Sequence, residues 1–204
     1  MNFFNIDGPF QRIGSFVFDI IVLGLLWTLI SLCGFGITIG AVTTALYSSC
    51  YIALVKEEGY VVKTFFITLK NKFLKSTLVW IILVVLYILM YFNITSITKG
   101  LIDIQWLLPI YFSITIELFF ITVYIFPLIS MSELGIKKLF KYSFILANKH
   151  LPWTILCAGL FILLFIAVFY INPLIIMILI AVVCYINSKI LIKKIISRYD
   201  TTMF

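Results

Sequence analysis

The chain is poor in charged residues and has a single histidine. Asp, Glu, Lys and Arg make up 11% of its 204 residues, against about 25% in an ordinary soluble domain. Hydrophobic residues make up 64%, and the mean hydropathy is +1.21. This composition predicts an all-α membrane protein that crosses the bilayer several times. No shift of composition or low-complexity linker divides the chain, so we expect residues 1–204 to form a single transmembrane domain.

Motifs that carry chemistry are also missing. The four cysteines lie within or at the ends of apolar stretches and lack the CxxC spacing of a metal site. We interpret them as small packing residues. We find no Walker motif, nucleophile elbow, zinc pattern or paired-carboxylate site. The sequence therefore predicts a protein that is not an enzyme and that has no cofactor and no metal site.

Six apolar stretches are expected to cross a hydrocarbon core of about 30 Å as helices. They comprise residues 16–33, 39–55, 76–97, 105–130, 151–171 and 174–192. Two charged connections, around residues 62–73 and 136–147, carry apolar residues at helical spacing and are expected to form amphipathic helices in the cytoplasmic headgroup region. Seven of their lysines are expected to face lipid headgroups: Lys63, Lys70, Lys72, Lys75, Lys137, Lys138 and Lys141.

The basic residues indicate the orientation. Of the 15 lysines and arginines, all except Lys99 fall in the N-terminal segment, the two amphipathic connections or the C-terminal end. The positive-inside rule then places both termini in the cytoplasm, which requires an even number of spans and fits six. The net charge of +7 is explained by these membrane-flanking lysines, so no nucleic-acid partner is expected.

Small residues recur at every fourth position in the second apolar stretch. Two helices gain no hydrophobic energy by meeting in lipid, so close backbone approach and hydroxyl hydrogen bonds must hold them together. We therefore predict that this stretch is the helix against which the others pack. Its expected packing face comprises Gly40, Ala41, Thr44, Ala45, Ser48 and Ser49.

A weak internal repeat relates the two halves of the chain. Asn71-Lys72, Leu74 and Thr77 recur 77 residues later as Asn148-Lys149, Leu151 and Thr154. The pair Glu57 and Gly59 matches Glu133 and Gly135 at nearly the same offset. The pattern predicts two units of the same orientation, residues 39–97 and 105–171, as in transporters built from parallel repeats.

Two acids lie inside expected spans, where a charge costs about 2.5–3.5 kcal/mol on insertion scales. Asp19 and Glu117 are therefore candidate functional residues. Asp19 has the alternative of reaching water or Arg12 near the end of its span. Glu117 has two alternatives, a neutral hydrogen-bonded carboxyl and a contact with a basic residue of another chain.

Acids at helix ends mark candidate docking sites. Glu57 and Glu58 precede Gly59 at the end of the second stretch, where the helix dipole disfavours negative charge. This placement indicates a cationic partner in the cytoplasm or local pairing with lysines. Glu133 and Gly135 occupy the matching place in the second unit, in a stretch that faintly resembles the loop by which ABC permeases engage their ATPases.

The sequence resembles the YesL family of small bacterial membrane proteins. The resemblance rests on Asp19 with Trp27, on TIGAVTTALY at residues 38–47, and on EEGY at residues 57–60 ahead of FF and LKNKF. Gly34-Phe35-Gly36 stands where the family usually has a proline, and Gly24 stands where it often has an asparagine. The resemblance implies a bacterial cytoplasmic membrane protein linked to carbohydrate uptake, often beside ABC transporters.

Our first functional hypothesis is an accessory subunit that packs its helices against the permease subunits of a carbohydrate ABC importer. It would contact membrane lipids and form a hetero-oligomer, with a homo-oligomer as an open alternative. The second hypothesis is a small-solute transporter or channel that uses the intramembrane acids Asp19 and Glu117. A membrane-embedded enzyme ranks third.

Overall fold

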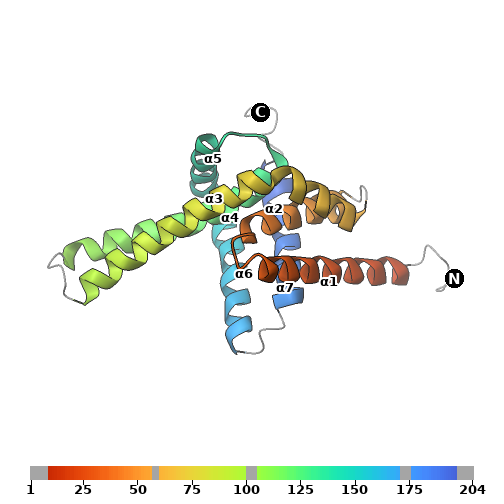
Figure 1. Cartoon of the computed structure of the whole chain (residues 1–204), viewed down its shortest axis with the longest axis horizontal. Coiled ribbons are helices and arrows are strands. Elements are labelled where there is room, and N and C mark those ends of the chain that lie inside the picture. The colour runs from red at the N-terminus through yellow and green to blue at the C-terminus, as the bar shows by residue number, and fades with distance from the viewer. Residues whose placement is uncertain (1–8, 57–59, 100–104, 171–175, 197–204) are drawn as a thin grey trace.

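The computed structural model describes residues 9–56, 60–99, 105–170 and 176–196, and every regular element in these ranges is a helix (Figure 1). This confirms the all-α expectation. The α-helices are α1 (Pro9–Cys33), α2 (Ile39–Ser49), α3 (Val61–Thr98), α4 (Leu108–Met131), α5 (Ile136–Lys149), α6 (Leu151–Tyr170) and α7 (Ile176–Asn187). Shorter segments are the 3-10 turn Gln105–Leu107 and two π-helical segments, Cys50–Val55 after α2 and Ser188–Ile195 after α7.

Five helices in the described residues are long and apolar enough to cross a membrane. They are Gly14–Cys33, Val61–Thr98, Gln105–Met131, Leu151–Tyr170 and Ile176–Ile195. Much of their surface is apolar and exposed, which fits contact with lipid in a multi-pass membrane protein. The second expected span corresponds to a shorter apolar helix, Ile39–Ile52.

Helix α2 lies at the centre of the molecule. All residues from Gly40 to Ser49 are buried, and α2 contacts α1, α3, α4 and α7. At Gly40 the backbones of α2 and α3 come so close that an added Cβ would lie 2.5 Å from Trp80 Cβ and 2.7 Å from the Ser76 carbonyl oxygen. Gly24 has the same role where α1 crosses α7, since a Cβ there would collide with the Met177 carbonyl group.

Helix α3 differs from the sequence-based expectation. The prediction of a separate amphipathic helix at residues 62–73 is wrong, because Val61–Thr98 is one uninterrupted helix of 38 residues. This segment contains neither glycine nor proline, so no residue ends the helix between its basic and its apolar parts. At about 1.5 Å per residue, α3 is about 57 Å long.

The second amphipathic segment does form a separate helix, α5. The chain turns at His150, and α6 begins directly after it with Pro152 in its first turn, a position that suits proline because no hydrogen-bond donor is needed there. Leu139, Ser143 and Leu146 are buried on α5, which packs along α4. The two units of the expected repeat therefore differ in shape, since one continuous helix in the first matches two helices in the second.

The molecule consists of a body and an arm. In Figure 1 the C-terminal half of α3 and the N-terminal half of α4 run side by side away from the other helices. The hydroxyl groups of Tyr87 and Thr122 meet at 3.0 Å across these two helices. We call residues 81–98 of α3, the 3-10 turn Gln105–Leu107 and residues 108–117 of α4 the two-helix arm.

Replacing Gly40 with alanine tests whether close approach of α2 and α3 holds the body together. We expect Gly40→Ala to lower the stability by about 1–3 kcal/mol, because the new methyl group forces two backbones apart. Thermal unfolding in detergent, followed by circular dichroism, measures the loss. Gly159→Ala on α6 is the matched control, since a Cβ there meets nothing within 4 Å; it should leave the stability unchanged or raise it slightly. Equal effects of the two substitutions would contradict the assignment.

Candidate functional site: an aromatic-lined cavity

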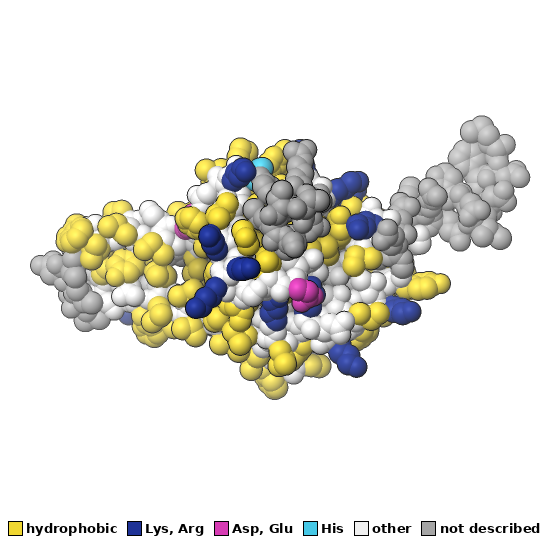
Figure 2. Space-filling model, turned by 90° about the horizontal axis from the view of Figure 1, so that it is seen from above, with side chains coloured by type: hydrophobic (Ala, Val, Ile, Leu, Met, Phe, Trp, Pro, Cys, Tyr) yellow, Lys and Arg dark blue, Asp and Glu magenta, His cyan; other side chains and the backbone are white. Residues whose placement is uncertain are grey.

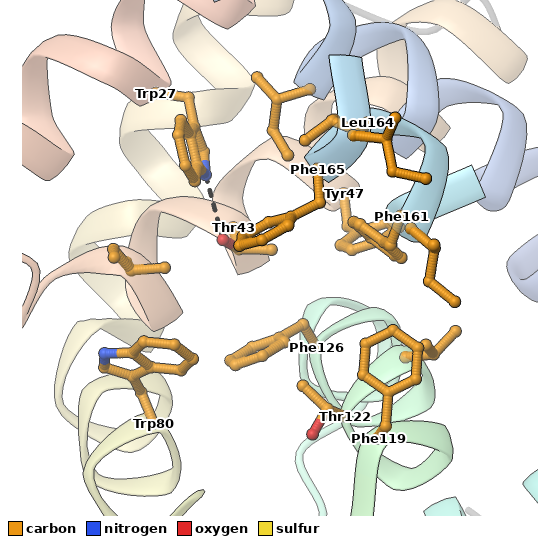
Figure 3. Close-up of a pocket in the computed structure, with 15 residues that line it drawn as sticks. Trp27, Thr43, Tyr47, Trp80, Phe119, Thr122, Phe126, Phe161, Leu164 and Phe165 are labelled. Carbon is orange, nitrogen blue, oxygen red and sulfur yellow. Dashed lines mark hydrogen bonds between the residues drawn. The ribbon is translucent and has the colours of Figure 1, made fainter. Parts of the chain in front are cut away.

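A cavity of about 550 Å³ lies in the body, between residues of α1, α2, α3, α4, α6 and α7 (Figure 3). Its volume lies within the range of about 300–1,000 Å³ typical of small-molecule sites. The rings of Trp80 and Phe126 pack at one side with centroids 6.2 Å apart. The other Trp and Phe side chains of the wall are Trp27, Phe119, Phe161 and Phe165.

Apart from the buried hydroxyl group of Tyr47, the polar side chains of the wall are hydrogen-bonded to other parts of the protein. Trp27 donates its indole N–H to Thr43 Oγ1 at 3.0 Å (Figure 3), and Trp80 donates to the Gly36 carbonyl oxygen at 3.0 Å. Thr122 donates to the Leu118 carbonyl oxygen at 2.8 Å. None of the lining residues carries a charge. The cavity therefore offers an apolar, aromatic surface to an occupant.

The cavity opens along α6. Ile162, Phe165 and Ile166 line it and are also 52%, 64% and 47% exposed. These exposed side chains are apolar and belong to a helix long and apolar enough to cross a membrane, so the mouth is bordered by surface suited to hydrocarbon rather than to water.

A buried polar cluster lies behind the cavity, between α2 and α7. Tyr47 lines the cavity and is 1% exposed, and its hydroxyl group approaches the fully buried Asn187 and Cys184. Within the described chain, neither the Tyr47 hydroxyl nor the Asn187 amide completes a hydrogen bond. The sequence analysis did not single out these residues, although an asparagine inside an apolar stretch is itself a signal.

The two intramembrane acids lie apart from the cavity wall. Glu117 is half-buried on α4 and accepts a hydrogen bond of 2.7 Å from the Asn148 amide at the end of α5. Asp19 is half-buried on α1, and the side chain of Arg12 lies outside the described residues. Neither acid is among the residues that line the cavity.

Lys72 joins the two halves of the chain. Its ammonium group donates to the carbonyl oxygens of Ile129, Ser130 and Ser132 at 2.8, 3.3 and 3.1 Å, and it lies 3.1 Å from Glu133 Oε1. The last carbonyl groups of α4 have no partner inside the helix, so a cation at this end satisfies them and complements the helix dipole. The expectation that Lys72 faces lipid headgroups is therefore wrong.

The other expected headgroup lysines keep their side chains at the surface, apart from the half-buried Lys75. Lys63, Lys70, Lys137, Lys138 and Lys141 are exposed. Figure 2 shows basic side chains gathered over the body, whereas the arm presents mainly hydrophobic and neutral atoms.

The remaining predicted residues fall in three places. The expected small-residue face of α2 is buried throughout, and Thr68 donates a hydrogen bond of 2.9 Å to Ser48. Glu133 is 84% exposed despite its contact with Lys72, and Gly135 is the exposed residue before α5. Glu57, Glu58 and Gly59 lie outside the described residues.

Substitution of Lys72 tests its contact with the carbonyl groups at the end of α4. We expect Lys72→Met to lower the stability by about 1–3 kcal/mol, because several carbonyl oxygens at the end of α4 lose their donor while the side chain stays unbranched and only one atom shorter. Thermal unfolding in detergent measures the change. Lys70→Met, at an exposed position two residues earlier on the same helix, is the control and should have little effect. The role of Lys72 is contradicted if both variants unfold at the same temperature as the wild type.

Comparison of the chain with curated proteins and with solved structures finds no significant match. A family model does match α1 from Ile20 onwards, α2 and nearly all of α3. The matched part is well under half of the chain and excludes α4 to α7. Residues 20–94 are thus similar to the family described as "Protein of unknown function, DUF624", which is the family that includes YesL-like proteins.

Proposed function

We propose that the protein is an accessory subunit of a membrane transport assembly, which it joins by packing its helices against those of a partner. In this proposal the chain crosses the bacterial cytoplasmic membrane six times, with both termini in the cytoplasm. The single observation that carries the proposal is the two-helix arm, which leaves the body and exposes apolar side chains to its surroundings.

Many apolar side chains of the arm are exposed, because the contact between its two helices covers only part of their surface. Ile88, Tyr91 and Phe92 on α3 are 48%, 67% and 62% exposed, and Phe112 and Ile116 on α4 are 48% and 55% exposed. Several polar side chains of the arm bond to the backbone of their own helix, as Asn93 does to Leu89 and Ser113 to Pro109. A surface of this kind suits contact with lipid or with the apolar helices of another membrane protein.

The partner class comes from the family resemblance. YesL-like sequences imply a link to carbohydrate uptake, and residues 20–94 are similar to the family that includes them. We therefore propose the permease subunits of a carbohydrate ABC importer as partners.

The alternative of an independent transporter finds less support in the geometry. That role was expected to use Asp19 and Glu117, yet neither acid lines the cavity, and the cavity wall is uncharged. Glu117 is already engaged by Asn148. A polar solute in this cavity would therefore meet neither acid.

Recovery of the tagged protein from native membranes tests the proposal. We expect permease subunits of a carbohydrate importer to co-purify, as identified by mass spectrometry. We also expect Tyr91→Ala combined with Phe92→Ala to lower their recovery at least fivefold, because the pair supplies exposed aromatic surface on the arm. Phe169→Ala combined with Tyr170→Ala removes another exposed aromatic pair from α6 and should leave recovery unchanged.

Two results would argue against the proposal. If the tagged protein reproducibly comes out alone from native membranes, it is not an accessory subunit. If both double variants recover the partner equally well, the arm is not the contact surface.

A further inference from the structure

We propose that the aromatic-lined cavity holds one acyl chain of a membrane phospholipid. This inference concerns the body of the protein and does not depend on the proposed role of the arm. It follows from the volume of the cavity, from the state of its polar groups and from the place where it opens.

The volume suits a thin occupant better than a helix of a partner protein. A helix with side chains is at least about 10 Å wide and rises about 5.4 Å per turn, so one turn occupies about 400 Å³. A cavity of about 550 Å³ accommodates little more than one such turn. An extended hydrocarbon chain is much thinner, so a long part of it fits in the same volume.

The polar groups of the wall offer a sugar few free hydrogen-bond partners. Thr43 accepts the Trp27 indole N–H, and Thr122 is bonded to Leu118 and Tyr87. The Tyr47 hydroxyl is buried out of reach of an occupant. A sugar would lose its hydrogen bonds to water and find few replacements, which is unfavourable. An uncharged hydrocarbon chain gives up no such bonds.

The mouth of the cavity gives such a chain a lateral route. Ile162, Phe165 and Ile166 present apolar surface both to the cavity and to the surroundings of α6. Transfer of an acyl chain from the bilayer to the cavity brings no gain in hydrophobic free energy, since both environments are apolar. The gain is van der Waals contact, because the aromatic walls would otherwise border unfilled volume and forfeit their attraction to neighbouring atoms.

Two tryptophans in the wall allow a direct test. In a variant with Trp106→Phe and Trp153→Phe, the fluorescence comes from Trp27 and Trp80 alone. The protein is purified in detergent and titrated with a phosphatidylcholine that carries bromine atoms on its acyl chains, which quench a tryptophan on contact. We expect quenching that saturates with lipid concentration, as binding at one site requires.

A variant with a filled cavity gives the decisive comparison. Val123 is a buried residue of α4 that lines the cavity, so Val123→Phe places a larger side chain at the cavity wall. We expect it to reduce the saturable quenching at least fivefold. Val85→Phe makes the same change at a 50% exposed position on α3 that does not line the cavity. Its fluorescence should be quenched as strongly as that of the variant with Trp106→Phe and Trp153→Phe alone. If Val123→Phe does not fold, Ile180→Phe fills the cavity from α7.

Three results would overturn the inference. Quenching that rises in proportion to lipid without saturation would show general contact with the micelle. Equal quenching of the Val123→Phe and Val85→Phe variants would place the bound lipid elsewhere. Recovery of a polyisoprenyl compound instead of phospholipid, by mass spectrometry of the purified protein, would replace the proposed occupant. Each result can be obtained whether or not a permease co-purifies, so the two proposals fail separately.

Discussion

Close backbone approach around α2 is the constraint on which the rest of the structure depends. In lipid, helices gain nothing by hiding apolar side chains from one another, so they associate only where packing is tight or polar groups meet. Gly40 supplies this contact between α2 and α3, and Gly24 supplies it between α1 and α7. The small residues of α2 are buried together at the centre of the body, and the longer helices are arranged around them.

Hydrogen bonds between helices complete this packing. Trp27 to Thr43 joins α1 and α2, Thr68 to Ser48 joins α3 and α2, and Tyr124 with Thr154 joins α4 and α6. Lys72 on α3 bonds to carbonyl groups 57 to 60 residues away, at the end of α4. Such bonds have few competitors in an apolar environment, so each one also fixes the relative position of two helices.

The separation of body and arm suggests a division of tasks. In the body the helices pack against one another and enclose the aromatic cavity. The two helices of the arm extend away from the body, so most of their neighbours must be lipid or another protein (Figure 1). This arrangement suits a protein that assembles with others through one part and contacts lipid through another. The intramembrane acids do not line the cavity, so its apolar wall has properties quite different from those of a path for polar solutes.

The sequence by itself determined the helical, membrane-embedded character of the protein, because composition and apolar stretches of span length depend only on local residues. It also contained the reason for the continuous α3, a segment without glycine or proline, although the change from basic to apolar residues at its middle suggested two elements. Only the tertiary structure decided the partners of Lys72 and Glu117 and the existence of a cavity whose wall runs from Trp27 to Ile180. These features join residues that are distant along the chain, and local pattern carries no information about which helix faces lie together.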